Sequence, residues 1–315
     1  MYKNHRIGVV VPAYNEELLL PETLAGMPAY VDKIFVVNDA SRDRTLEMIE
    51  KRRAEDPRVI LIDHEKNKGL GQTLIDGYLA SARSDIDITA VMAGDNQMHP
   101  DDLSVLLERV IDDGFDYVKG NRLLHQNIDF MPKYRFLGNA ALTILTKFAT
   151  GYYSLMDPQC GYTVIRNTAL RGIPIERMTK GYGYNADILT MLNIRGYSVS
   201  DAEVRPVYGR EKSKIKLWKY VPKTSWLLFR LFFRRLWQRY VVRDFHPLVL
   251  FYLFAFFNVI FLIIPLIVRF IHLYRMEGVA PRTTLILLVF LLITTFQSIL
   301  FAIWMDMDYN TRKRR

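Results

Sequence analysis

The sequence predicts an α/β domain whose mostly parallel sheet is wrapped by helices, followed by two transmembrane helices. Short apolar runs alternate with helical stretches over about the first 120 residues, and acidic loops follow several of these runs. Further along, residues 247–268 and 283–305 are uncharged and almost wholly apolar. At about 1.5 Å per residue, a helix over either segment crosses a hydrocarbon core of about 30 Å.

The elements of the α/β domain follow from composition and spacing. The apolar runs are rich in valine and isoleucine, which favour strands, whereas the stretches between them have helical length and composition. We expect strands at residues 7–11, 34–37, 59–62, 88–92 and 117–118. We expect helices at residues 17–27, 43–54, 71–82, 101–112, 136–149 and 185–194. Ligands bind at the carboxyl ends of the strands in a sheet of this kind.

The chain divides into three parts by composition. We expect the α/β domain at residues 1–215, a basic interfacial region at 216–245, and two spans with a short basic tail at 246–315. The net charge is +9, but residues 205–243 alone carry +11 and the first 204 residues carry −5. A basic excess beside a membrane span attracts anionic headgroups, so the charge indicates a membrane surface rather than a nucleic acid. Two buried helices of a soluble domain are the alternative to the spans, although such helices seldom run this long without a charge.

The basic region contains a predicted amphipathic helix at residues 226–242. Its arginines recur every fourth residue, and leucine, phenylalanine and tryptophan fill most of the other positions. Such a helix lies in the membrane interface, whereas a plain solvated run of charges is the alternative.

The sequence also predicts the orientation. The apolar run at residues 7–11 is too short for the core of a signal peptide, so we expect the α/β domain in the cytoplasm. With two spans the basic tail at residues 312–315 returns to that side, in agreement with the positive-inside tendency. The single cysteine, Cys160, excludes an internal disulfide and a multi-cysteine zinc site, and predicts a buried thiol. A monomer and a homo-oligomer both remain open.

Two loops carry the candidate chemistry. The fourth apolar run leads into Gly94-Asp95-Asn96-Gln97, and the first ends in Pro12-Ala13-Tyr14-Asn15-Glu16. Hard cations such as Mg²⁺ or Mn²⁺ choose oxygen ligands, and they offset the charge of a leaving nucleotide diphosphate. The two loops together predict a nucleotide-sugar site with Asp95 as metal ligand. The alternative is that Asp95 only caps the loop before Pro100.

A resemblance follows from these loops together with further motifs. Two of the further motifs are Val37-Asn38-Asp39-Ala40-Ser41-Arg42-Asp43 and Asn67-Lys68-Gly69-Leu70-Gly71. The series resembles glycosyltransferase family two, which implies a GT-A fold. Later segments are similar to its dolichol-phosphate mannose synthase and polyprenyl-phosphate glucosyltransferase branch, namely Asn121-Arg122, Gln159-Cys160-Gly161-Tyr162 and Tyr208-Gly209-Arg210-Glu211-Lys212-Ser213-Lys214.

The resemblance implies roles on the donor side. Asp39 would meet the base or ribose, and the nucleotide pocket would be shaped by Pro12, Tyr14 and Glu16. Gln97 would supply a second oxygen to the metal, whereas the family's further acid two residues before Asp95 is replaced here by Ala93. Lys68 lies beside a glycine and near another, which permit close approach to an anion, although a simple turn is the alternative.

The resemblance implies a second set of residues for the acceptor. A lipid phosphate would be held by Arg122, Arg135, Arg210, Ser213 and Lys214, and arginine suits this task because its fork pairs with two oxygens. The alternative for Arg210 and Lys214 is contact with lipid headgroups alone. Asp187 would face the sugar, or else lie on a helix surface. The expected catalytic residues are Asp95, Arg122, Arg135 and Asp187.

The expected activity is transfer of one sugar, with inversion, from a UDP- or GDP-linked donor to dolichyl or undecaprenyl phosphate at the cytoplasmic membrane face. A processive polysaccharide synthase is less favoured, because Trp237-Gln238-Arg239-Tyr240 does not supply the Gln-x-x-Arg-Trp motif usual in such enzymes. A catalytically silent membrane scaffold that binds nucleotide-sugars is the alternative from outside the enzymes.

Overall fold

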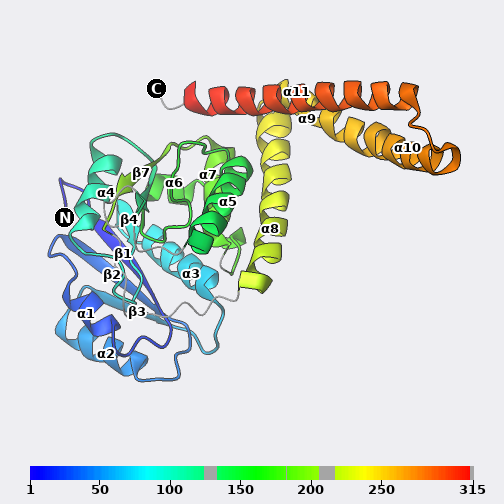
Figure 1. Ribbon diagram of the computed structural model, residues 1–315. Helices are drawn as coiled ribbons and strands as arrows, with labels where there is room; N and C mark the ends of the chain where they lie inside the picture. The colour runs from blue at the N-terminus through cyan, green and yellow to red at the C-terminus, as the bar shows by residue number, and fades with distance from the viewer. Residues whose placement is uncertain (124–132, 182, 206–216, 313–315) are drawn as a thin grey trace. The chain divides into compact units, whose positions relative to one another are not determined.

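The computed structural model describes residues 1–123, 133–181, 183–205 and 217–312 (Figure 1). The chain forms two compact units, Met1–Arg235 and Leu236–Arg315. The first unit therefore extends past residue 215, where the composition placed the end of the α/β domain.

The first unit contains, within the described residues, a seven-stranded sheet in the order β3-β2-β1-β4-β6-β5-β7. The strands are β1 Ile7–Ala13, β2 Val31–Asn38, β3 Val59–Asp63, β4 Ile88–Val91, β5 Tyr117–Asn121, β6 Thr163–Arg166 and β7 Val199–Glu203. Only β6 runs antiparallel to its neighbours among these strands, so the mostly parallel sheet is confirmed. The last two strands were not predicted, because β6 has four residues and β7 is largely polar.

Helices cover both faces of this sheet (Figure 1). The helical segments that begin in this unit are α1 Leu20–Ala25, α2 Thr45–Glu55, α3 Leu70–Ala82, α4 Asp102–Ile111, α5 Lys133–Thr150, α6 Asn167–Arg171, η2 Ile175–Arg177, α7 Tyr184–Arg195 and α8 Leu217–Trp237. One hydrophobic cluster joins α1, α2 and α4 to the sheet, and a second joins α3, α6 and α7 to it.

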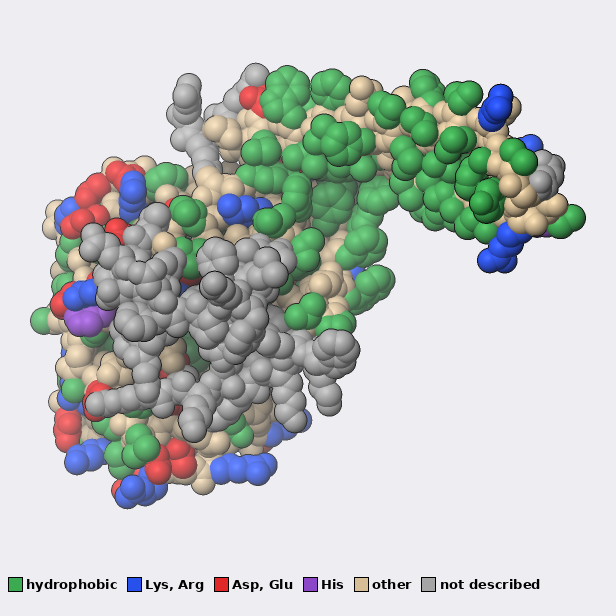
Figure 2. All heavy atoms as spheres, in the orientation of Figure 1, with side chains coloured by type: hydrophobic (Ala, Val, Ile, Leu, Met, Phe, Trp, Pro, Cys, Tyr) green, Lys and Arg blue, Asp and Glu red, His purple; other side chains and the backbone are tan. Residues whose placement is uncertain are grey.

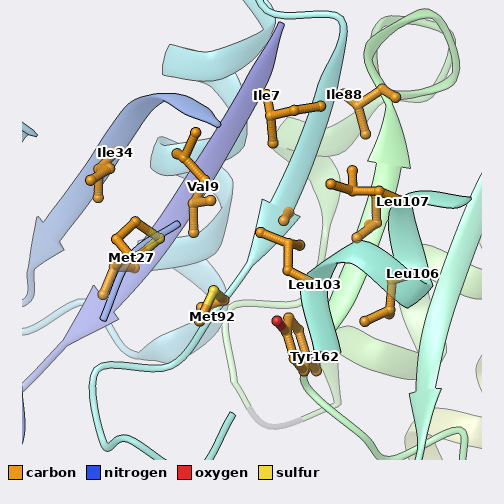
Figure 3. Packing of buried hydrophobic residues seen from close by; sticks show 14 of the residues in the cluster. Ile7, Val9, Met27, Ile34, Ile88, Met92, Leu103, Leu106, Leu107 and Tyr162 are labelled. Carbon is orange, nitrogen blue, oxygen red and sulfur yellow. The ribbon is translucent and has the colours of Figure 1, made fainter. Parts of the chain in front are cut away.

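The strands divide their side chains between the two clusters with a period of two. In β1, Val9 and Val11 belong to the first cluster, whereas Val10 belongs to the second. Figure 3 shows the first cluster, in which Leu103 and Leu106 of α4 face the strands. All of these side chains are fully buried, and this two-sided core fixes the strand ends that carry the site loops.

Helix α8 differs from the expected interfacial helix in the direction of its arginines. Arg235 is fully buried and donates to the carbonyl oxygens of Phe148 and Ala149 at 2.9 and 3.1 Å. These carbonyls end α5, where a cation is favourable. Arg234 donates to Asp187. Both side chains therefore bind protein, and the expectation that this basic face meets lipid headgroups is wrong for these two residues.

The exposed side of α8 is aromatic. Trp226 and Phe229 stack with ring centroids 5.6 Å apart, and Phe233 and Trp237 continue the same exposed series. Exposed apolar patches of this kind mark protein or membrane contacts.

The second unit consists of helical segments. Their bounds are η3 Gln238–Arg243, α9 Leu248–Phe257, η4 Asn258–Ile263, α10 Ile264–Glu277 and α11 Arg282–Arg312. Among the described residues, two helices are long and apolar enough to cross a membrane, Leu248–Met276 and Arg282–Thr311. Only 22% of the most apolar stretch of each is buried, unlike a core helix of a soluble domain. Figure 2 shows hydrophobic side chains over most of their visible surface, so the predicted pair of candidate spans is confirmed.

Candidate active site

The loops after β1, β2 and β4 meet at the carboxyl edge of the sheet. The Asp39 N–H donates to the Ala13 carbonyl at 3.0 Å, which joins the second loop to the first. The Gly94 N–H donates to the Pro12 carbonyl at 3.2 Å, which joins the Asp95 loop to the same strand. Pro12 is half-buried between these loops. Because β2 and β4 lie on opposite sides of β1, the connections diverge here and leave room for a ligand.

Each of these loops contains one non-glycine residue in the left-handed region. Their φ angles are 57° at Asn15, 55° at Ala40 and 56° at Asn96. Such residues are uncommon, and they cluster at binding sites where surrounding contacts hold them. Asn15 receives the Arg42 N–H on Oδ1 at 2.8 Å, and the Asn96 amide donates to Glu22 at 3.0 Å. The loops are therefore held in one shape before any ligand arrives.

Tyr14 and Glu16 lie in the first loop, as the sequence predicted. The Tyr14 side chain is exposed and Glu16 is half-buried. The Glu16 N–H donates to the Thr45 hydroxyl at 2.8 Å, and its carbonyl receives the Leu20 N–H at 2.9 Å at the start of α1. The main chain of Glu16 thus fixes the turn that presents these two side chains.

Asp39 follows β2 and is 3% exposed. Its Oδ1 receives the Lys68 N–H at 2.8 Å and its Oδ2 receives the Gly69 N–H at 2.9 Å. The Nδ1 of His64 lies 2.8 Å from the same Oδ1. The carboxylate therefore shapes the loop before α3, and its expected contact with the base or ribose remains a prediction.

His64 extends this arrangement to a second carboxylate, and the motif analysis missed it. Its Nε2 lies 2.9 Å from Asp76, which also accepts from Gln72 at 3.0 Å. The Lys68 ammonium lies 3.8 Å from Asp76 and is 40% exposed, so it remains accessible to an anionic ligand. The available sequence signal was a histidine directly after β3, on the edge where the other loops meet.

Asp95 is half-buried in the loop after β4, and its Oδ1 receives the Gln97 N–H at 3.1 Å. The Gln97 side chain is exposed. Ala93, at the position of the family's further acid, donates its N–H to the Met98 sulfur at 3.2 Å. The described residues contain no group of three or more histidine, cysteine or acidic side chains that could hold a metal. One carboxylate still fits Mg²⁺ or Mn²⁺, because such ions take many of their oxygens from substrate phosphates.

Arg122 follows β5 and forms a two-point ion pair with Asp157. The two nitrogen–oxygen distances are 2.8 Å for Nε and 3.3 Å for Nη2. Asp157 is 6% exposed, whereas the Arg122 side chain is 40% exposed. Asp157 therefore orients a guanidinium that still faces solvent. Sequence reasoning missed Asp157, although it lies two residues before the quoted segment that begins at Gln159.

A buried lysine binds the segment that begins at Gln159. Lys119 of β5 donates to the Cys160 carbonyl at 2.6 Å and to the Asn185 side chain at 2.8 Å. Burial lowers the pKa of Lys119 to about 8. Cys160 is 3% exposed, as expected for a buried thiol.

Asp187 does not lie on a helix surface, and its expected role at the sugar stays a prediction. It is 2% exposed, so it is no surface carboxylate. Its Oδ2 receives the Thr179 N–H at 2.8 Å and the Thr179 hydroxyl at 2.7 Å, and its Oδ1 receives Arg234. Asp187 therefore links Thr179 to Arg234 of α8.

Part of the expected acceptor site lies outside the described residues. Arg210, Ser213 and Lys214 belong to the undescribed segment 206–216. Arg135 lies in the first turn of α5, and its side chain is not described. Of the expected acceptor residues, the described structure therefore shows the side chain of Arg122 alone.

Comparison with protein families identifies the chain. The model of glycosyl transferase family 2 matches residues 8–173, which include the loops after β1, β2 and β4. The chain belongs to glycosyl transferase family 2. This confirms the family that the loop motifs resembled.

Relatives of known activity support the expected branch. The chain is 26% identical over 216 residues to the UDP-N-acetylglucosamine–dolichyl-phosphate N-acetylglucosaminyltransferase of Methanococcus voltae, covering 64% of this chain and 86% of the relative. It is 30% identical over 190 residues to the undecaprenyl-phosphate mannosyltransferase of Micrococcus luteus, covering 58% and 76%. Both relatives, by name, transfer a sugar to a polyprenyl phosphate.

Solved structures support the fold. Glucosyl-3-phosphoglycerate synthase from Mycobacterium tuberculosis, crystallised with Mn²⁺, UDP-glucose and phosphoglyceric acid, matches with a TM-score of 0.54 and 18% identity. The match covers 74% of this chain and 80% of that chain. The GT-A-like fold is confirmed.

Proposed function

We propose that this protein transfers a single sugar from a nucleotide-diphosphate donor to a polyprenyl phosphate at the cytoplasmic face of a membrane, with inversion. The observation that carries the proposal is the combination of a glycosyl transferase family 2 domain with two candidate spans in one chain. Relatives that act on dolichyl and undecaprenyl phosphate support the acceptor class.

The donor occupies the edge formed by the loops after β1, β2 and β4. Tyr14 and Glu16 line the nucleotide pocket, and Asp39 shapes it through the two backbone N–H groups that it binds. Lys68 reaches the diphosphate from the start of α3. The donor is a UDP- or GDP-linked sugar.

Asp95 and Gln97 would hold Mg²⁺ or Mn²⁺ beside the donor. When bound, the ion offsets negative charge on the leaving nucleotide diphosphate. Asp95 suits this role because it is half-buried at the strand end, and its Oδ1 is already aligned by the Gln97 N–H.

The acceptor phosphate lies against Arg122, which Asp157 orients. We place Arg135, Arg210, Ser213 and Lys214 around the same phosphate. Its oxygen attacks the anomeric carbon as the bond to the diphosphate oxygen breaks, so one displacement inverts the configuration. A lipid phosphate is already anionic at neutral pH, and the step therefore needs positioning charges more than a general base.

The exposed aromatic series of α8 enters the membrane interface, where amphipathic rings are favourable. The candidate spans anchor the chain, and its basic residues 312–315 share the cytoplasmic side with the catalytic domain. We propose domains at residues 1–215, 216–245 and 246–315, with the first part of α8 folding as part of the catalytic unit.

The test is a screen of UDP- and GDP-linked sugars against a short polyprenyl phosphate, using purified full-length protein in detergent. Mass spectrometry should find one product lipid that carries one sugar, with the anomeric configuration opposite to that of the donor by NMR. Several sugars per lipid would indicate a processive synthase. Tight nucleotide-sugar binding without transfer to any lipid would indicate a scaffold, and either result would overturn the proposal.

A further inference from the structure

Helix α8 reaches the donor edge of the site through Asp187. Arg234 donates to one oxygen of this buried carboxylate, and Thr179 occupies the other with its N–H at 2.8 Å and its hydroxyl at 2.7 Å. Asp187 is 2% exposed, so water cannot replace either partner without rearrangement. One carboxylate therefore fixes α8 and the segment at Thr179 to each other.

The Thr179 segment in turn packs directly on the start of α3. The Gly71 N–H donates to the Lys180 carbonyl at 2.9 Å. A Cβ placed on Gly71 would lie 2.2 Å from the Thr179 carbonyl oxygen and 2.5 Å from the Lys180 carbonyl carbon. The two backbones are thus in contact without space between them, and a shift of one displaces the other.

The start of α3 carries the loop that Asp39 binds. Gly69 has a φ of 88°, and a Cβ there would lie 3.1 Å from the Lys180 carbonyl. The N–H groups of Lys68 and Gly69 both donate to Asp39. The contacts therefore run without interruption from Arg234, through Asp187 and the Thr179 segment, to the proposed nucleotide loop.

We propose that Arg234 is a positioning residue for the donor: it holds the Lys68–Gly69 loop in its nucleotide-binding shape by fixing Asp187 and, through it, the Thr179 segment. The inference rests on the proposed function, because it takes this loop as the nucleotide site. Loss of Arg234 leaves a buried negative charge without its cationic partner, which favours movement of the carboxylate, and of the Thr179 segment bound to it, toward water. Seating of α8 on the catalytic unit thereby sets donor affinity.

The test is calorimetric binding of UDP and GDP to the full-length protein in detergent, which requires no transfer. Arg234→Ala should weaken binding of the preferred nucleotide about tenfold, as expected for loss of one charge-assisted contact, and Arg234→Lys should restore part of it. Arg230→Ala, which removes an exposed arginine from the same helix, should leave the affinity unchanged. In transfer assays, the KM for the donor should rise in Arg234→Ala while the KM for the acceptor stays the same.

A double-mutant cycle separates this path from general loss of stability. Thr179→Val removes the hydroxyl that Asp187 accepts, so its effect on nucleotide affinity should be less than additive with that of Arg234→Ala. Arg235→Met removes the buried arginine of α8 that binds the end of α5. It should lower the thermal midpoint, yet leave the affinity of the folded protein unchanged.

Three results would overturn the inference: unchanged affinity in Arg234→Ala, full additivity in the cycle, or equal weakening by Arg235→Met. These outcomes are distinct from failure of the proposed function, which would appear as wild-type protein that binds nucleotide but transfers no sugar.

Discussion

Both compact units bury polar side chains, but in opposite surroundings. In the first unit, the buried Asp39 lies at the end of β2, above a closed apolar core. In the second, Asp306 is fully buried, and Asn258 donates to Thr295 at 3.3 Å, between helices whose outer side chains are apolar and exposed. The first unit hides apolar groups and presents polar loops, whereas the second presents apolar groups outward and pairs its polar groups inside.

The polar contacts of the two units are therefore expected to have different roles. Polar groups at the strand ends shape loops that a ligand can reach, so their loss should change binding or turnover. Polar groups between apolar helices satisfy one another where water is absent, so their loss should change stability and leave the chemistry intact. A strand-end variant that changes only stability, or a variant between the apolar helices that changes turnover, would contradict this division.

The largest expected effect tests where the first unit ends. A chain of residues 1–235 should fold in mild detergent, whereas a chain of residues 1–215 should aggregate or unfold. The shorter chain loses Leu228 and Leu231, each about 2 kcal/mol when buried, and removes the Arg234 partner of Asp187. Circular dichroism and thermal unfolding of both chains check this, and a stable cooperative fold in the shorter one would show that residues 1–215 fold without α8.

The next effect concerns Asp95. Asp95→Ala should lower transfer by at least about a hundredfold, corresponding to about 2.7 kcal/mol or more, because the leaving diphosphate loses its metal ligand. The thermal midpoint should stay within about 2 °C, since a loop carboxylate contributes little to the core. Gln97→Ala should show a smaller loss. Near-normal turnover of Asp95→Ala after chelation of metal would refute the assignment.

Replacement of Arg122 should weaken binding of the acceptor and leave binding of the donor unchanged. Arg122→Ala removes a charge-assisted contact worth about 1.5 to 3 kcal/mol, so the KM for the lipid phosphate should rise roughly ten- to a hundredfold. Calorimetry with the nucleotide-sugar should find the donor affinity of Arg122→Ala unchanged, and the same holds for Arg135→Ala. Asp39→Ala and Glu16→Ala provide the contrast, because they should weaken binding of the donor instead. A collapse of donor affinity in both arginine variants would place these residues in the nucleotide pocket.

In the second unit, Asp306 should matter for stability alone. It accepts the Tyr240 hydroxyl and the Asn310 amide, the latter at 2.9 Å. Asp306→Ala leaves both donors without this partner and should destabilise the helices by about 1 to 3 kcal/mol. Thermal unfolding in detergent measures the loss, and donor KM serves as the control. A change in donor KM without a change in stability would contradict the proposed division between the units.

The smallest expected effect is the pH dependence contributed by Lys119. Its pKa is lowered from 10.5 to about 8 in the folded protein, so between these values the unfolded chain binds more protons than the folded one. Stability must then rise with pH in this window, by about 1 kcal/mol from pH 8 to 9. The thermal midpoint of the wild type relative to Lys119→Met should increase over that range. A flat or falling difference would show that the buried lysine keeps an ordinary pKa.

The first strands, the loops that follow them and the candidate spans could be predicted from the sequence, because each depends on local pattern. Valine- and isoleucine-rich runs specify β1 to β4, because a continuous apolar run suits a strand whose two faces are both covered. Chain order then places the loops after β1, β2 and β4 on one edge, so Asp39 and Asp95 could be selected from the sequence. The candidate spans could also be predicted from the sequence, since length and lack of charge define them.

The partners of the buried polar side chains could be identified only from the tertiary structure. Arg234 and Arg235 look like any arginines on an amphipathic helix, and their direction is set by Asp187 and by the end of α5, distant in sequence. Asp187 likewise takes Arg234 and Thr179 as partners, although neither is its neighbour in sequence. A burial pattern follows from local periodicity, but the pairing of buried charges depends on which distant segments are brought together, and no local pattern records that.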